Sequence, residues 1–303
     1  MLKLFTHTDL DGVGCAIIAR LLYGEDIDIA YCDYNEINEA VKEYINTATN
    51  DDICFITDIS ISEELAKEID NNDKIFVKLY DHHFTALGLN KYGWCTVKTQ
   101  NNGGINTCGT ELFFEDCIDS FPKKNLLPFI SDFVAMVRDY DTWRWTTLGD
   151  IGIFSKQLND LLYIYGREQF IVWIVEQINS KQFPDWGTTG YTLLENRKQE
   201  IIKYVDSKNK SMAKIELCGY KVGIVFADKY ISELGNKLCE LNNDIDFVAI
   251  LDLSNNKVSY RTIRNDINLG EFAKRFGGGG HPKAAGSMID NDSVFKFVKN
   301  LYC

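Results

Sequence analysis

The sequence predicts an α/β protein with an N-terminal parallel-sheet domain, a helical linker and a smaller C-terminal α+β domain. Short apolar runs alternate with helix-like stretches over the first 120 residues, strand character is lost over 150–210, and strand-like runs return after residue 212. Strands separated by helices are typical of βαβ units, which build parallel sheets. We expect the first domain to span 1–149, the connector 150–210 and the last domain 211–303.

Four apolar runs of the first domain have the length and composition of buried strands. They lie at 2–7, 27–32, 52–57 and 74–80. Helical periodicity occupies 12–23, 35–48 and 62–72, and Ser62 is the expected N-cap of the third helix. Two further helices are expected, one beginning at Thr110 and a largely buried one over 126–141.

The remaining elements follow from the same patterns. Apolar and charged residues alternate at helical spacing through 150–210, which predicts a helical connector. A hairpin is expected over 212–226, with Gly219 and Tyr220 near its turn. The pattern then predicts, in order, a helix at 231–242, strands at 246–252 and 257–263, a helix at 269–275 and a closing helix at 292–301.

Composition limits the compartment and the partners. The nine cysteines include no CxxC pair, which favours reduced thiols in the cytoplasm over a disulfide framework. No apolar run approaches the roughly 18 residues of a membrane span, so we expect neither a signal peptide nor a membrane partner. The net charge of −12 disfavours long duplex nucleic acid, because such binding depends on Lys and Arg contacts with phosphates.

The charge is unevenly distributed along the chain. Residues 206–303 hold 14 lysines and arginines and 12 acidic residues, so the excess of negative charge belongs to the first two-thirds. An acidic region that handles anions requires metal ions to offset the repulsion.

Acidic and imidazole side chains follow three of the predicted strands. They are His7, Asp9 and Asp11 after the first strand, Asp58 after the third, and Asp81, His82 and His83 after the fourth. In an open parallel sheet, ligands bind beyond the carboxyl ends of the strands. Alternate residues of an extended segment share a face, so we expect the first three side chains to point together. Asp139, at the end of a buried helix, could reach the same rim.

Each of these residues has a simpler interpretation when taken alone. Asp58 could be a helix N-cap, residues 9–12 could form a turn, and a single histidine is more often a core or surface residue. Their accumulation at one edge argues otherwise, because neighbouring carboxylates repel and raise one another's pKa. Metal ions remove that cost, and carboxylates with some imidazole suit Mn²⁺ or Mg²⁺. Two ions about 4 Å apart would favour displacement at phosphorus.

A second cluster lies near the C-terminus, in the segment SYRTIRNDINLGEFAKRFGGGGHPKAAG. A glycine run such as Gly277–Gly280 lets backbone N–H groups approach an anion closely. Arg261, His281 and Lys283 add donors suited to phosphate. The alternative is a flexible loop, which the glycines alone would equally fit.

In this order, HTDLDG, TDIS, DHH and the segment around Asp139 resemble the four motifs of DHH phosphoesterases. FGGGGHPKAAG resembles the glycine-rich signature of the DHHA1 domain that accompanies them. The resemblance implies two Mn²⁺ ions, with Mg²⁺ as an alternative. The implied ligands are His7, Asp9 and Asp58 for one ion and Asp11, Asp58, His82 and Asp139 for the other. We prefer Asp139 to Asp141 because RDYD aligns best with the family motif that way.

The resemblance also implies roles around the substrate. His83 would face the substrate phosphate, and Asp81 would orient a neighbouring imidazole. The implied substrate-binding groups of the second domain are Arg261, Gly278, Gly279, Gly280 and His281. They would hold a phosphate or a terminal nucleotide.

The resulting hypothesis is an Mn²⁺-dependent phosphoesterase acting on short oligonucleotides, dinucleotides or small phosphorylated nucleotides. The alternatives are an exopolyphosphatase- or pyrophosphatase-like hydrolase and a RecJ-like single-strand exonuclease. Short substrates are favoured because 303 residues leave no room for the extra nucleic-acid-binding domains of RecJ-type enzymes. A catalytically inactive nucleotide-binding module is disfavoured because every expected ligand is present. Whether the chain forms a homodimer stays open.

Overall fold

A computed structural model describes residues 1–49, 51–72 and 75–290. The chain divides into two compact units, Met1–Leu194 and the part from Glu195 onward. The boundary falls inside the expected connector, whose first helices belong to the first unit. The closing helix expected at 292–301 lies outside the described residues.

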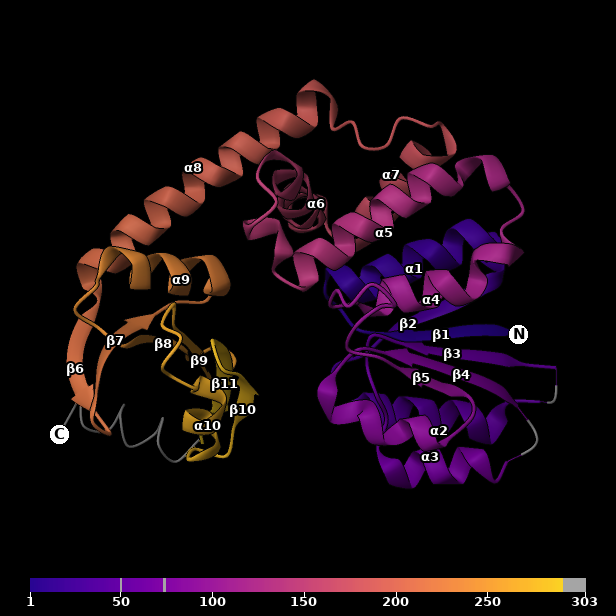
Figure 1. Ribbon diagram of the computed structural model, residues 1–303, viewed down its shortest axis with the longest axis horizontal. Coiled ribbons are helices and arrows are strands. Elements are labelled where there is room, and N and C mark those ends of the chain that lie inside the picture. The colour runs from indigo at the N-terminus through magenta and orange to yellow at the C-terminus, as the bar shows by residue number, and fades with distance from the viewer. Residues whose placement is uncertain (50, 73–74, 291–303) are drawn as a thin grey trace. The chain divides into compact units, whose positions relative to one another are not determined.

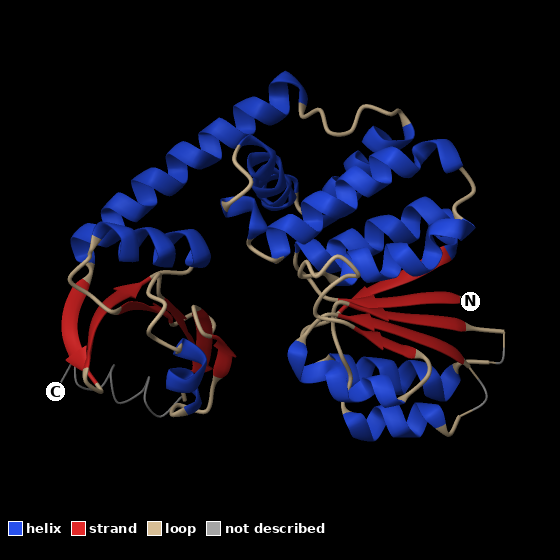
Figure 2. Cartoon of the chain, in the orientation of Figure 1, coloured by secondary structure: helices blue, strands red, loops and turns tan. Residues whose placement is uncertain are grey.

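The first unit is built on a five-stranded sheet with the order β2-β1-β3-β4-β5 (Figures 1 and 2). All of its neighbouring strands run parallel, as the βαβ pattern predicted. The strands are β1 (Leu2–Thr6), β2 (Ile27–Tyr31), β3 (Ile53–Thr57), β4 (Phe76–Asp81) and β5 (Cys95–Val97). The order places the ends of β1, β3 and β4 next to one another.

Helices cover both faces of this sheet (Figure 1). They are α1 (Leu10–Tyr23), α2 (Ile37–Thr47), α3 (Glu63–Asp70) and α4 (Gly109–Cys117). Side chains alternate along each strand, so Leu4 packs on the face that α1 and α4 cover, while Phe5 packs with α2 and α3. The result is a three-layer sandwich with apolar contacts on both sides of the sheet.

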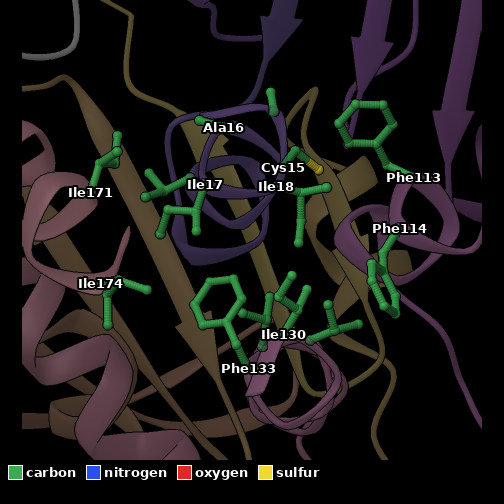
Figure 3. Close-up of a cluster of buried hydrophobic side chains, with 14 of the residues drawn as sticks. Cys15, Ala16, Ile17, Ile18, Phe113, Phe114, Ile130, Phe133, Ile171 and Ile174 are labelled. Carbon is green, nitrogen blue, oxygen red and sulfur yellow. The ribbon is translucent and has the colours of Figure 1, made fainter. Parts of the chain in front are cut away.

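The larger core extends beyond the sheet into a layer of further helices. They are α5 (Leu127–Asp141), α6 (Asp150–Tyr165) and α7 (Arg167–Asn179). Figure 3 shows Ile17 of α1 beside Phe133 of α5 and Ile171 of α7 in one continuous cluster of buried side chains. The stretch expected to act only as a connector therefore contributes helices to the core of the first unit.

Helix α8 (Gly187–Ser211) leads into the second unit, which is a six-stranded sheet with the order β10-β11-β9-β8-β7-β6. Only the β7–β8 pair is parallel, so the sheet is mixed. The elements are β6 (Ala213–Leu217), β7 (Tyr220–Phe226), α9 (Ile231–Leu241), β8 (Phe247–Asp252), β9 (Lys257–Arg261), α10 (Leu269–Lys274), β10 (Gly279–His281) and β11 (Ala284–Met288). Apolar clusters lie against α9 on one face and α10 on the other.

Local signals account for several element ends. The Ser62 side chain accepts from Leu65 N and begins α3, as predicted. Gly219, with φ of +85°, forms the expected hairpin turn between β6 and β7.

The eight cysteines within the described ranges are free thiols. Within those ranges, no helix is both long and apolar enough to cross a membrane.

Candidate metal centre

The first site residues lie where β1 gives way to α1. Asp9 is the N-cap of α1, and its Oδ1 accepts from the backbone N–H groups of Asp11 and Gly12, both at 3.2 Å. Its Oδ2 lies 3.0 Å from His7 Nδ1. The expectation of one extended segment carrying His7, Asp9 and Asp11 is therefore wrong, because Asp11 already belongs to the first turn of the helix.

Asp11 is held by a second helix start. Its carboxylate accepts from the backbone N–H groups of Gly109, at 2.6 Å, and Thr110, at 2.8 Å, which begin α4. Thr110 Oγ1 also donates to the Asp11 carbonyl at 2.7 Å. These donors at the N-terminus of α4 fix the orientation of the Asp11 carboxylate. Asp11 is 1% exposed, so its carboxylate is held in the interior of the protein.

Asp58 follows β3 in a left-handed backbone conformation, with φ of +56°. A positive φ is uncommon for a residue with a side chain and marks functional positions. A Cβ on Gly109 would lie 2.7 Å from the Asp58 Cβ, so only glycine allows α4 to begin this close to it. Asp58 does not cap a helix, because Ser62 has that role, and its buried Oδ2 has no hydrogen-bond partner among the described residues.

The two oxygens of Asp58 face two different histidines. Oδ2 lies 3.8 Å from His7 Nδ1, and Oδ1 lies 3.3 Å from His82 Nε2. His82 Nε2 is also 3.7 Å from Asp11 Oδ2 and 3.6 Å from Asp141 Oδ2. Three groups of side chains place possible ligand atoms within 4.8 Å of one another. One consists of Asp58, Asp81, His82 and His83, and the other two are His7, Asp9 and Asp58, and Asp11, His82 and Asp141. Asp58 lies between the last two.

The electrostatics of this cluster are unfavourable without cations. Burial, followed by the negative charges of Asp11, Asp9 and Asp141, raises the pKa of Asp58 well above its usual range. Burial and the neighbouring carboxylates raise the pKa of Asp141 in the same way. Burial lowers the pKa of His82, which keeps that imidazole neutral and able to act as a ligand. The donor set therefore fits hard divalent cations.

The structure corrects the predicted carboxylate of the fourth motif. Asp139 does not lie with the histidines: its Oδ1 accepts from Arg138 at 3.1 Å and from Arg144 at 2.8 Å. Asp141, two residues further along α5, lies beside His82 instead. The placement of Asp139 in the cluster is wrong because its charge is already neutralised by two guanidinium groups.

Asp81 and His83 form a pair at the end of β4. Asp81 Oδ1 accepts from His83 Nδ1 at 2.7 Å and from the His82 backbone N–H at 2.8 Å, while Oδ2 accepts from Ser60 Oγ. Burial alone would lower the pKa of His83, but the hydrogen bond and charge of Asp81 outweigh it and raise that pKa. With Nδ1 bonded to Asp81, Nε2 is the His83 nitrogen that remains for a second partner. The geometry agrees with the expected orienting role of Asp81.

One residue at the site was not predicted from the sequence. Tyr34 follows β2, and its hydroxyl lies 3.2 Å from His83 Nε2. Its ring centroid is 5.2 Å from that of His7. Because β2 is the parallel neighbour of β1, a residue that follows β2 could be expected near the residues that follow β1. A single tyrosine after a strand belongs to no recognisable motif, however, so the sequence did not single out Tyr34.

The second unit holds the predicted phosphate-binding residues. Register aligns Arg261 of β9 with Ala284 of β11, and Ala284 with His281 of β10, so the two predicted donors share one row of the sheet. Arg261 donates to Ser232 Oγ at 3.2 Å, and its buried Nε has no hydrogen-bond partner. Burial lowers the pKa of Arg261.

The glycines have a packing role as well. A Cβ on Gly278 would lie 2.0 Å from the Gly286 carbonyl oxygen, and one on Gly280 would lie 2.7 Å from that of Ala284. Gly279 has open space around its Cα, with nothing within 4 Å of an added Cβ. Two of the three glycines thus permit close strand packing, and binding of a phosphate by all three stays a prediction.

A parallel sheet whose carboxyl edge gathers carboxylates and imidazoles defines an α/β protein with an acidic site that can hold metal ions. The sequence profile of the DHHA1 domain matches residues 222–302. Oligoribonuclease NrnB of Bacillus subtilis (strain 168) is 34% identical over 310 aligned positions, covering 100% of this chain and 76% of the relative. The chain belongs to the DHH/DHHA1 phosphoesterase family and is a hydrolase that acts on phosphodiester bonds.

Solved structures agree with this fold. Exonuclease RecJ bound to manganese superposes with a TM-score of 0.61 at 14% identity, over 99% of this chain and 88% of that one. The pGpG-specific phosphodiesterase PggH from Vibrio cholerae gives a TM-score of 0.51 at 14% identity, over 99% and 97% of the two chains. The two-domain α/β architecture expected from the sequence is confirmed.

Proposed function

We propose that the protein is an Mn²⁺-dependent phosphoesterase that hydrolyses short oligonucleotides, dinucleotides or small phosphorylated nucleotides. The observation that carries the proposal is Asp58, a buried carboxylate whose two oxygens face two separate ligand groups. The relative with 34% identity is named an oligoribonuclease, which supports short RNA as the substrate class.

His7, Asp9 and Asp58 would hold one ion, and Asp11, Asp58, His82 and Asp141 would hold the second. Bound there, the two ions would neutralise the phosphate and activate water for in-line displacement. Mn²⁺ and Mg²⁺ both suit this donor set, and Mn²⁺ is preferred because imidazole contributes to both groups.

The remaining residues of the first unit prepare the site for the phosphate. The first two N–H groups of α4 hold the Asp11 carboxylate in place. Asp81 holds the His83 ring through Nδ1 and favours its protonated form, so Nε2 can donate to a phosphate oxygen. Arg261 and His281 of the second unit are proposed to bind a phosphate or a terminal nucleotide of the substrate.

The test is turnover of a defined panel with Mn²⁺. The panel comprises RNA chains from dimers to 20-mers, 3′-phosphoadenosine 5′-phosphate and inorganic polyphosphate. We expect the shortest RNA substrates or the small nucleotide to be hydrolysed with the highest kcat/KM. Preference for 20-mers would indicate an exonuclease of the RecJ kind instead, and turnover of polyphosphate alone would indicate a polyphosphatase.

The matched blank for this panel is Asp58→Asn. Asparagine tolerates the left-handed conformation that Asp58 adopts, whereas alanine would add backbone strain to the loss of charge. Activity that persists in Asp58→Asn would contradict the proposed site.

A further inference from the structure

We infer that Tyr34 is a substrate-positioning residue, whose exposed ring stacks on a nucleobase next to the phosphate under attack. The inference rests on the proposed function and adds to it the reason for choosing a nucleotide over an inorganic phosphate. It starts from the contacts of Tyr34 with two histidines of the site, His7 and His83.

Tyr34 lies between groups of both halves of the site. Its ring centroid is 5.2 Å from that of His7 and 6.0 Å from that of His83. His7 belongs to one proposed ligand group, and His83 is the proposed phosphate donor. A group held against this ring is therefore adjacent to a phosphate held by His83.

The backbone around Tyr34 is held in place by a set of local hydrogen bonds. Tyr34 N donates to Asp33 Oδ1 at 2.7 Å, and Asp33 N donates to Glu36 Oε2 at 3.2 Å. The Asp33 carbonyl accepts from Glu36 N at 2.9 Å and from Ile37 N at 3.1 Å, at the start of α2. Just before this turn, Cys32 N donates to the Thr6 carbonyl at 2.9 Å and ties it to β1. The ring thus projects from a fixed turn.

The orientation of the ring is set by its hydroxyl. The Tyr34 hydroxyl lies 3.2 Å from His83 Nε2, within hydrogen-bond distance, and Asp81 holds the His83 ring in place through Nδ1. Despite these contacts, Tyr34 remains 54% exposed. An aromatic side chain that is held at its hydroxyl end and still accessible to solvent is available to stack on a ligand.

A nucleobase is the ligand class that this arrangement fits. Proteins that bind single-stranded nucleic acid stack bases on aromatic side chains, and each stacked base contributes about 1–3 kcal/mol. Stacking is tolerant of base identity because every base has a π-face. Inorganic pyrophosphate and polyphosphate have no base, so stacking on Tyr34 would give nucleotides the higher affinity.

The test compares the binding of two ligands that differ only in the base. Adenosine 5′-monophosphate and ribose 5-phosphate are titrated calorimetrically into the full chain with Mn²⁺. We expect the wild type to bind the nucleotide more tightly. In Tyr34→Ala the nucleotide should lose about 5- to 150-fold in affinity, with ribose 5-phosphate unchanged. Tyr34→Phe and Tyr34→Trp keep an aromatic face and should retain the preference.

The control variant is Tyr191→Ala, which removes an exposed tyrosine of α8 and should leave both affinities unchanged. Equal weakening of both ligands in Tyr34→Ala, or a wild type that does not distinguish them, would overturn the inference. A Tyr34→Phe chain that behaves like Tyr34→Ala would also overturn it, because the hydroxyl and not the ring would then carry the effect.

A kinetic readout separates positioning from a merely structural role. On a dinucleotide, Tyr34→Ala should raise KM and leave kcat within about 3-fold, since the ring contacts the base and not the reacting atoms. A fall in kcat with KM unchanged would contradict the inference. The binding comparison needs no turnover, so a wild type without phosphoesterase activity would refute the proposed function while the role of Tyr34 is judged separately.

Discussion

At the scale of single residues, Asp58 combines three costs: a left-handed backbone, burial, and repulsion from three carboxylates. Functional sites keep such residues because the surrounding structure compensates for them. The consequence is a carboxylate that destabilises the metal-free chain and is required by the proposed reaction.

We therefore predict that Asp58→Asn stabilises the metal-free protein. The substitution removes a buried negative charge from a cluster of like charges and suits the positive φ. In EDTA, the midpoint of thermal unfolding should rise by about 2–4 °C for each kcal/mol gained. Differential scanning calorimetry measures this. A lower midpoint in EDTA would show that Asp58 is stabilised by contacts other than those described.

Asp139 and Asp141 give a matched pair for a second prediction. Asp141→Asn should lower kcat/KM by more than about 100-fold, because a ligand loss exceeds the 10- to 100-fold typical of supporting residues. Asp139→Asn should retain Mn²⁺ binding but cost about 1–3 kcal/mol, because the neutral amide loses the negative charge that strengthens the hydrogen bonds from two guanidinium groups. Activity assays and urea denaturation measure the two effects. The reverse pattern would restore Asp139 as the ligand.

The sequence alone could not separate these two aspartates. Both lie in the last turn of α5, and a step of two residues rotates a side chain by about 200° around a helix. The side that faces the sheet edge depends on how α5 packs, which motif spacing does not contain. Arg138 and Arg144 were the one available hint, since they suit an ion pair with Asp139.

At the scale of elements, the start of α4 positions site residues that lie far from it in the sequence. Its first two N–H groups hold Asp11, and the missing side chain of Gly109 admits Asp58. A helix that begins about 100 residues after Asp11 therefore sets the geometry of the first motif.

We predict that Gly109→Ala displaces this helix start. The added Cβ would meet Asp58 Cβ at 2.7 Å, and such overpacking typically costs about 1–3 kcal/mol. Activity should fall further than stability, because both Asp11 and Asp58 shift. Gly93→Ala is the matched control, since an added Cβ there has nothing within 4 Å and should change neither. Unaltered kcat/KM in Gly109→Ala would contradict the positioning role of α4.

The elements predicted from the sequence were those with strong periodicity. The four long strands of the first unit and helices α1, α2, α3 and α9 lie where the patterns placed them, to within a few residues. Strands β5, β10 and β11 were not predicted. β5 has three residues, and β10 consists of Gly279, Gly280 and His281, so neither carries an apolar alternation. Their pairing with longer neighbours, rather than their own composition, makes them strands.

At the scale of the whole chain, the proposed metal ligands all belong to the first unit, Met1–Leu194. Ligands that bind only the folded state stabilise the part that holds them. Mn²⁺ should therefore protect the ends of β1, β3 and β4 and the start of α4 from hydrogen exchange, and leave β7 and β8 unchanged. Mass spectrometry of exchange with and without Mn²⁺ measures this by segment.

The control for that experiment is Asp141→Asn, which should show a reduced response to Mn²⁺ in the first unit. Protection of β7 and β8 as strong as that of β1 would place a metal site in the second unit, against the proposal.

Asp9 serves the helix and the site with different oxygens: Oδ1 caps α1 and Oδ2 meets His7. Loss of the cap would cost about 1 kcal/mol of folding stability whatever the catalytic state. In a related protein that has lost the catalytic activity, selection for folding would still retain Asp9, or an asparagine or serine in its place. Asp58 would have no such protection and should be lost early. The fate of Asp58 is thus the better indicator of whether a divergent copy of this gene still encodes an enzyme.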